Sequence, residues 1–327
     1  MRAREIKSGL KSLIEIRQPV FLWGAPGIGK SQVVAQVAKE MGLDVKDVRA
    51  VLLDPVDLRG LPHINDDKRA DWSIPAFLPH GGEGILFLDE LNAAPPLVQA
   101  ACYQLVLDRR LGEYQLPDGW SVVAAGNREN DRAVTYRMPS ALANRFVHFD
   151  FEVNVDDWLD WATAEHLPAE LVSFIRFRPN LLHDFDPQRN QKAFPTPRSW
   201  EFVARILRAD NKPGLERNLI AGAVGEGAAA ELSGYLEIWR ELPESQALLN
   251  KPQSVDVPKD PATLFAVCEM LAREASAATI APILAFAARL PSEFNVLLVR
   301  NSVSFDNTLV ESSAFADWAE NNAGVLV

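Results

Sequence analysis

One glycine-rich stretch constrains this chain more than any other feature of its sequence. Residues 24–31 read Gly-Ala-Pro-Gly-Ile-Gly-Lys-Ser and fit the pattern G-x-x-x-x-G-K-[ST], in which backbone N–H groups surround phosphate oxygens. The apolar residues 19–23 before it are typical of a buried strand, and apolar residues recur at helical spacing after it. Gly42 occupies the position of a helix C-terminal glycine. We therefore interpret the stretch as a nucleotide site between a strand and a helix.

Single residues of this stretch have expected roles. Lys30 should reach the β- and γ-phosphates of a nucleotide, and the Ser31 hydroxyl should contact Mg²⁺. The loop backbone, at a helix N-terminus whose dipole favours anions, would hold the other phosphate oxygens. An accidental match, a glycine-rich turn with an unrelated lysine, is expected in about one per cent of chains of this length. The predicted nucleotide-binding residues are Gly24, Ala25, Pro26, Gly27, Ile28, Gly29, Lys30, Ser31 and Gln32.

The composition is that of a folded protein with an acidic surface. The 327 residues are 48% hydrophobic and 24% charged, which allows two or three domains with apolar cores. Subtracting 44 acidic from 33 basic residues gives a net charge of −11, so only a local basic stripe could attract nucleic acid. Cys102 and Cys268 lie in apolar helical patterns and are expected in the core, in a reducing compartment. The histidines show no metal-ligand spacing, and no zinc site is predicted.

The sequence also bears on location. Residues 1–16 carry apolar side chains at the spacing of an amphipathic helix, not the continuous apolar core of a signal peptide. The chain contains no run of about eighteen apolar residues, the length that a membrane-spanning helix needs. We therefore expect a cytoplasmic protein with no membrane insertion.

Strand and helix patterns alternate over the first part of the chain. Residues 95–108 have the spacing of a helix between two strands. The expected strands are short and apolar, as in a parallel sheet buried on both faces. The pattern predicts a three-layer α/β nucleotide-binding core with a parallel sheet over residues 1–151. The strands are expected at residues 19–23, 48–53, 84–88, 121–125 and 146–151.

Two long excursions interrupt this core, at residues 54–83 and 111–120. The second reads as a small hairpin. Long excursions from a compact core are often functional, but surface decoration is an equally good interpretation here.

Beyond residue 151 the pattern is helical. We predict an all-α domain over residues 152–243 and a helical C-terminal extension over residues 244–327, and leave open whether the two pack as one body. A polar, proline-bearing linker is expected at residues 251–261. Helices are expected over residues 158–164, 168–177, 197–207, 217–242, 262–274, 276–288, 291–301 and 312–321.

Polar side chains follow two of the expected strands. Asp89 and Glu90 end the apolar residues 85–88, and Asn127 follows the apolar residues 122–125. Beside a phosphate-binding loop, Asp89 can hold Mg²⁺, and Glu90 can orient and deprotonate an attacking water. Asn127 could hydrogen-bond the γ-phosphate or that water, although such an Asn is more often a turn former. Alone, the carboxylates would suggest a solvated acidic turn, but their pairing with residues 24–31 favours catalysis.

These motifs, in this order, resemble the AAA+ ATPases. Residues 54–60, 89–96 and 138–146 narrow the resemblance to the MoxR-like branch. The resemblance covers about residues 19–207 and implies a homo-oligomeric ring, usually a hexamer, with ATP bound between neighbouring subunits. The helical domain after the core would then be a lid, and the two excursions would be the inserts of this branch.

The resemblance also implies roles for single polar residues. Asn127 takes the sensor-1 position. Arg145 matches the arginine finger, which completes the neighbouring subunit's site, with Arg137 and Arg132 as nearby rivals. Arg198 matches sensor 2 at the start of a lid helix; its alternative is an ordinary arginine at a helix N-terminus. The insert aromatics Trp72, Phe77 and Tyr114 are expected to pack rather than to contact a partner.

Three functions fit these features. The first is an ATP-driven, chaperone-like remodeller, whose partner by family analogy carries a von Willebrand factor A domain. The second is a nucleic-acid motor, which the acidic inserts disfavour. The third is a nucleotide-gated scaffold with little turnover, which an intact Glu90 disfavours.

Overall fold

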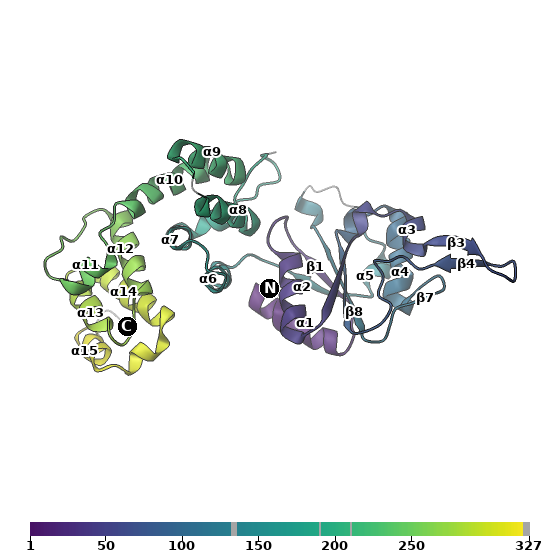
Figure 1. The fold of residues 1–327 in the computed structure, drawn as a ribbon, viewed down its shortest axis with the longest axis horizontal. Coiled ribbons are helices and arrows are strands. Elements are labelled where there is room, and N and C mark those ends of the chain that lie inside the picture. The colour runs from purple at the N-terminus through teal and green to yellow at the C-terminus, as the bar shows by residue number, and fades with distance from the viewer. Residues whose placement is uncertain (132–135, 190, 210, 323–327) are drawn as a thin grey trace. The chain divides into compact units, whose positions relative to one another are not determined.

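The computed structural model describes residues 1–131, 136–189, 191–209 and 211–322 (Figure 1). The chain forms two compact units. The first comprises Met1–Asp160 and Leu182–Phe202, and the second comprises Trp161–Leu181 and Val203–Val327. The three-part division into residues 1–151, 152–243 and 244–327 stays a prediction.

The first unit is built around a five-stranded parallel sheet with the strand order β2-β5-β8-β1-β9. The three inner strands β5, β8 and β1 are almost wholly buried, as their apolar sequences predict. Helices cover both faces of the sheet, so the predicted α/β class is confirmed. The strands are β1 (Val20–Trp23), β2 (Asp44–Arg49), β5 (Gly84–Asp89), β8 (Trp120–Gly126) and β9 (Val147–Asp150).

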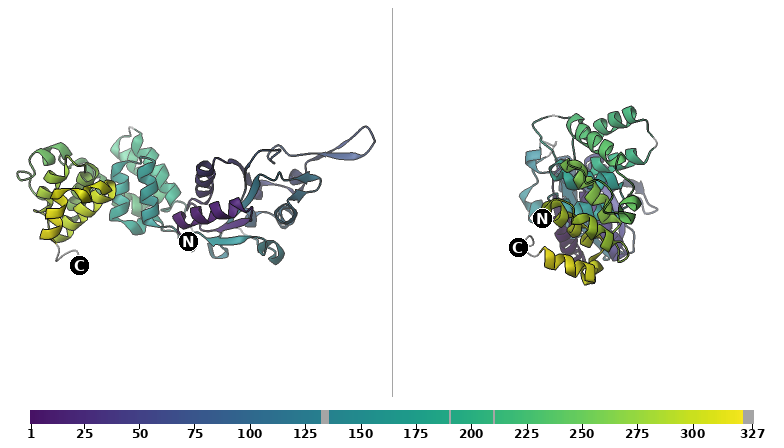
Figure 2. Two further views of the ribbon diagram at one scale, coloured as in Figure 1. Left: turned by 90° about the horizontal axis from the view of Figure 1, so that it is seen from below. Right: turned by 90° about the vertical axis from the view of Figure 1, so that its left-hand side faces the viewer.

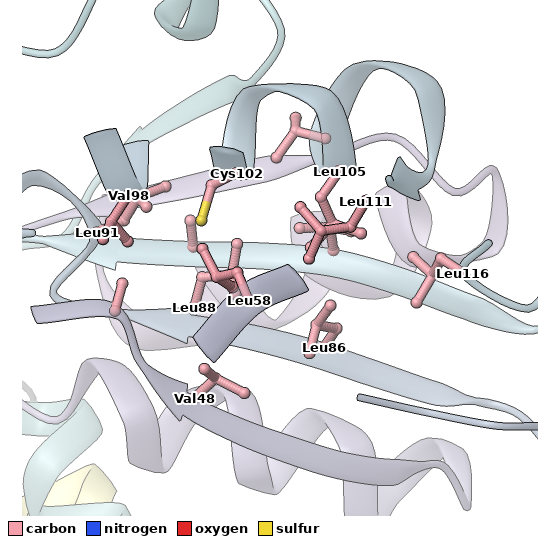
Figure 3. Packing of buried hydrophobic residues seen from close by; sticks show 14 of the residues in the cluster. Val48, Leu58, Leu86, Leu88, Leu91, Val98, Cys102, Leu105, Leu111 and Leu116 are labelled. Atoms are coloured by element: carbon pink, nitrogen blue, oxygen red, sulfur yellow. The ribbon is translucent and has the colours of Figure 1, made fainter. Parts of the chain in front are cut away.

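Alternating side chains of the inner strands fill two separate cores, because successive residues of a strand point to opposite faces. Ile85 and Phe87 of β5 pack with α1 (Ala3–Glu15) and α2 (Lys30–Met41). Leu86 and Leu88 pack on the other face with α3 (Pro55–Arg59), α4 (Pro96–Asp108) and α5 (Ser140–Ala143). Figure 3 shows this second core, in which Cys102 of α4 lies buried as predicted.

Strand β2 differs from the sequence prediction. A buried strand was expected at residues 48–53, but β2 is Asp44–Arg49, and a 3₁₀ turn at Ala50–Leu52 follows it. Only Val48 of this strand is buried. Strand β2 lies at the sheet edge and pairs with β5 from Asp44 opposite Gly84 to Arg49 opposite Asp89. The position of this edge strand is therefore determined by backbone pairing with β5 and not by the apolar residues that follow it.

Both excursions form hairpins. The first contains β3 (Leu61–Ile64) and β4 (Ala70–Ser73), which project away from the central sheet (Figures 1 and 2). The second pairs β6 (Arg110–Leu111) with β7 (Tyr114–Gln115), as predicted. Packing explains their aromatic residues: the buried Tyr114 hydroxyl donates to the Pro79 carbonyl oxygen at 2.7 Å, and Phe77 packs against the core. Trp72 is half-buried, with the Arg59 guanidinium 4.0 Å from its ring centre.

The second unit is helical. The single helix expected over residues 217–242 is two helices, because Gly225 adopts φ 85° and ψ 160°, which a continuous helix cannot contain. Cys268 lies in the core of this unit, as predicted. None of the helices in the described ranges has the length and apolar character that crossing a bilayer requires. The helices are α6 (Val155–Ala164) and α8 (Pro197–Arg208), which contain the unit boundaries, α7 (Ala169–Phe177), α9 (Pro213–Val224), α10 (Glu226–Arg240), α11 (Ser245–Asn250), α12 (Pro261–Arg273), α13 (Ile280–Ala287), α14 (Ser292–Phe305) and α15 (Ser313–Asn321).

Candidate nucleotide-binding site

The glycine-rich loop connects β1 to α2, as the sequence predicts. Gly27 has φ 76° and Gly29 has φ 101°, a region that residues with a side chain rarely adopt. A Cβ atom at Gly27 would lie 2.8 Å from the Thr196 hydroxyl oxygen. The loop therefore needs glycine at this position both for its backbone angle and for the close approach of another segment.

Lys30 joins the loop to the end of strand β8. Its ammonium group donates to the carbonyl oxygens of Gly24 at 2.6 Å and Ala25 at 3.1 Å, and to Asn127 Oδ1 at 3.0 Å. Because β1 and β8 are parallel neighbours, their carboxyl ends meet at one edge, and Lys30 and Asn127 lie there together.

Burial changes the charge balance of Lys30. It lowers the pKa of the ammonium group from its ordinary 10.5 to about 8, and the nearby Asp89 carboxylate partly opposes this shift. The positive charge of Arg198 adds to the lowering. A partly desolvated cation of this kind gains strongly from contact with an anion.

Ser31 and Asp89 provide a pair of oxygen ligands. The Ser31 hydroxyl donates to Asp89 Oδ2 at 3.2 Å, and the Glu90 backbone N–H donates to Asp89 Oδ1 at 3.0 Å. Hydroxyl and carboxylate oxygens suit Mg²⁺, which usually takes few protein ligands and completes its shell with phosphates and water. The described residues contain no group of three or more His, Cys, Asp or Glu side chains placed to hold a metal. Ser31 and Asp89 thus fit a Mg²⁺ ion that is shared with bound phosphates.

Glu90 has an unusual backbone conformation. Its φ is 54° and its ψ is 34°, the left-handed region, which costs a residue with a side chain about 1 kcal/mol or more. The side chain is exposed directly after Asp89, at the carboxyl end of β5. Strained residues of this kind often occur at functional sites, and the position suits a residue that meets a water molecule.

Asn92 lies next to the site, although the sequence indicates for it only a place near the start of the following helix. It is 2% exposed, and its Nδ2 donates to the Asn127 carbonyl oxygen at 2.7 Å. Its Oδ1 lies so close to Gly126 that a Cβ atom there would be 2.1 Å away. The signal in the sequence is a polar residue between the apolar Leu91 and Ala93, directly after the carboxylates.

A distant part of the first unit covers the loop. The backbone N–H of Arg198 donates to the Gly27 carbonyl oxygen at 3.1 Å. Gln32 Nε2 donates to Glu201 Oε2 at 3.0 Å, a contact that the sequence analysis missed. The Arg198 side chain is exposed, and its positive charge contributes to the lowered pKa of Lys30.

Arg145 lies apart from these residues. Its side chain is exposed after α5, and it forms no hydrogen bond or ion pair with any described residue of its own chain. Its rival Arg137 is also exposed, and Arg132 lies outside the described residues. Within one chain the structure thus gathers Lys30, Asp89 and Asn127, but not Arg145.

Comparisons with known proteins agree with this geometry. Residues 19–148 match the model of the family described as "ATPase family associated with various cellular activities (AAA)". Midasin of Giardia intestinalis is 28% identical over 177 residues, which are 50% of this chain and 4% of that protein. RuvB, a subunit of the Holliday junction branch migration complex of Chlorobium chlorochromatii, is 32% identical over 93 residues, 28% of this chain and 22% of that protein. The chain thus matches less than a quarter of the length of these relatives.

Among solved structures, the Thermotoga maritima RuvB branch migration motor is 17% identical, with a TM-score of 0.42, over 77% of this chain and 75% of that one. The family match covers the glycine-rich loop, both carboxylates and Asn127. Residues 19–148, less than half of the chain, are therefore similar to the AAA family.

Proposed function

We propose that this chain binds ATP with Mg²⁺ and hydrolyses it to ADP and phosphate. One observation supports this most: Lys30 bonds to Asn127 while Ser31 bonds to Asp89, so the phosphate-binding loop meets both strand ends. The side chains that would bind the phosphates and the Mg²⁺ of ATP are thereby close to one another.

Each residue has a distinct task. Lys30 binds the terminal phosphates, while Ser31 and Asp89 would hold Mg²⁺, which neutralises phosphate charge. Glu90 accepts the proton of the attacking water. Asn127 keeps its Oδ1 on Lys30 and has a side-chain N–H group with no bond to another described residue, so this group can donate to the γ-phosphate or to the water.

Glu90→Gln tests this assignment. It removes the base but keeps the size of the side chain, so kcat should fall by about 10²-fold or more while nucleotide binding is retained. Glu113→Gln, an exposed glutamate of the second hairpin, is the matched control and should keep its turnover. Equal kcat values for Glu90→Gln and wild type would refute the role of Glu90.

We further propose that the active form is a homo-oligomeric ring, expected to be a hexamer, in which Arg145 acts on the site of a neighbouring subunit. The exposed Arg145 side chain, which has no hydrogen bond or ion pair among the described residues of its own chain, supports this role. Arg145→Ala should lose turnover but keep nucleotide binding. Mixing it with Glu90→Gln subunits should restore part of the activity, because some interfaces then combine an intact Glu90 with an intact Arg145. If this mixture recovers no activity, Arg145 does not have this role. The same holds if activity is recovered only when Arg137→Ala subunits, and not Arg145→Ala subunits, are mixed with Glu90→Gln subunits.

Arg198 is proposed to act as sensor 2, within a helical lid over residues 152–243 that responds to the nucleotide. Its backbone bond to Gly27 and its electrostatic effect on Lys30 support this role. Arg198→Ala should therefore reduce turnover more than it reduces overall stability.

The preferred biological role is remodelling of a partner protein, expected to carry a von Willebrand factor A domain. Leu61 and Ile64 on the projecting hairpin are 69% and 79% exposed, so both apolar side chains are available to contact a partner. Glu90→Gln, used as bait with ATP and Mg²⁺ in lysate of the source organism, should capture one such partner. Capture that persists without nucleotide would contradict ATP-dependent remodelling.

A nucleic-acid motor is the second candidate, because one matched relative is a subunit of a Holliday junction branch migration complex. The first excursion opposes it, since its acidic residues outnumber its basic ones. DNA binding that weakens steeply with added salt would favour the motor. The charged residues are Asp54, Asp57, Asp66, Asp67, Asp71 and Glu83 against Arg59, Lys68 and Arg69.

A further inference from the structure

A chain of side-chain contacts connects the nucleotide loop to the turn that carries Arg145. Trp23 is the last residue of β1 and directly precedes Gly24. Its indole N–H donates to His148 Nδ1 at 2.8 Å. His148 lies on β9, the parallel neighbour of β1, and its Nε2 contacts the Ala143 carbonyl oxygen at 2.8 Å. One imidazole therefore bridges the end of the loop strand and the end of α5.

These two contacts determine which imidazole nitrogen of His148 carries the hydrogen. An indole N–H can only donate, so Nδ1 must be the unprotonated acceptor. A carbonyl oxygen can only accept, so Nε2 must carry the hydrogen and donate it. His148 is exposed, and a side chain in its place can form both bonds only if it carries one acceptor and one donor.

The backbone on both sides of Arg145 is held in place. The Arg145 N–H donates to the Leu142 carbonyl oxygen at 3.0 Å, and the Phe146 N–H donates to Ala143 at 3.2 Å. Gln18 Nε2 donates to the Arg145 carbonyl oxygen at 3.5 Å. Because the Arg145 side chain itself is exposed, the direction in which it leaves the protein depends on this turn.

We propose that His148, held by Trp23, is a positioning residue for Arg145. Its two hydrogen bonds couple the position of the β1 end to that of the Ala143 carbonyl. His148 thereby sets the direction of the arginine side chain that one subunit presents to the next. The proposal rests on the proposed role of Arg145 in a neighbouring site. The rings of Phe21 and Phe146, whose centres are 5.5 Å apart, both pack against the imidazole. These apolar contacts have little directional preference, so the hydrogen bonds of the two ring nitrogens orient the imidazole.

Three variants separate positioning from packing. His148→Leu keeps apolar volume but loses both hydrogen bonds, while His148→Gln retains one acceptor and one donor. Trp23→Phe keeps an aromatic ring but removes the indole N–H together with part of the ring volume. His80→Leu, at an exposed histidine, is the control.

We expect His148→Leu and Trp23→Phe to lower kcat by about tenfold, because displacement of a catalytic group by about 1 Å costs this much or more. The KM for ATP should stay within about twofold. His148→Gln should recover most of the loss. In an Arg145→Ala background, His148→Leu should cause no further loss, since both changes act through one group.

Hydrogen–deuterium exchange gives a second readout that needs no activity. The segment containing Ala143, Arg145 and Phe146 should exchange faster in His148→Leu than in wild type or His148→Gln. Unchanged exchange, or additive kcat losses with Arg145→Ala, would overturn the proposal. If Arg145→Ala itself keeps full turnover, the proposed function of Arg145 fails, and the exchange result still decides whether His148 holds the turn.

Discussion

Raising the pH should weaken ATP binding through one residue, Lys30. Its pKa is lowered to about 8 by burial, against 10.5 for an ordinary lysine. From about pH 7.5 to about pH 9, the charged fraction of a group with this pKa falls about eightfold, from about three quarters to about one eleventh. Bound phosphates favour the charged form, so they raise the pKa of Lys30 in the complex. The affinity for ATP should therefore fall by up to about eightfold over this range, and binding near pH 9 should take up a proton.

Titration of the protein with a fluorescent ATP analogue at both pH values measures the effect. Lys30→Arg is the control, because a guanidinium stays charged throughout and its affinity should not depend on pH in this way. Where that variant binds too weakly, calorimetry of wild type in buffers of different ionisation enthalpy detects the proton uptake. A wild-type affinity that stays constant over this range would refute the reasoning, because a lysine with an ordinary pKa remains charged at both values.

Two further substitutions test the packing around the site. Asn92→Ala removes the bond to the Asn127 carbonyl oxygen and should lower the free energy of unfolding by about 1–3 kcal/mol; an unchanged urea midpoint would contradict this. Gly27→Ala forces a Cβ atom to within 2.8 Å of Thr196 at a φ of 76° and should both destabilise the first unit and weaken ATP binding. Gly222→Ala in α9, where a Cβ atom meets nothing within 4 Å, should instead stabilise by about 0.5–1 kcal/mol, and thermal melts should rank the two glycine variants in that order.

The parts of the site that could be predicted from sequence are those set by local chemistry. The loop is recognisable because its glycines and Lys30 are contiguous, and Asp89 and Asn127 stand out because each follows an apolar strand. Their meeting at one edge follows from parallel strands, whose carboxyl ends lie side by side.

The missed features depend on distant segments. The Gln32–Glu201 contact and the approach of Thr196 to Gly27 join residues more than 150 positions apart, and no local pattern encodes them. Strand β2 was misplaced because an edge strand is specified by its partner β5 more than by its own apolar residues. Gly225 was overlooked because a single glycine within a helical pattern is a weak signal of a break.

The place of β1 in the sheet order has a consequence for how this chain can change. β1 is bonded to β8 along one flank and to β9 along the other, from Val20 to Trp23 on both sides. The strand that precedes the loop thus serves as a common reference for Asn127 after β8 and for Arg145 before β9. A substitution in β1 should therefore affect two places at once: the nucleotide site of the same subunit and the Arg145 side chain that this subunit presents to its neighbour. Strand β2 lies at the far edge and is bonded to one neighbour only. Substitutions in β2 should therefore leave Asn127 and Arg145 in place.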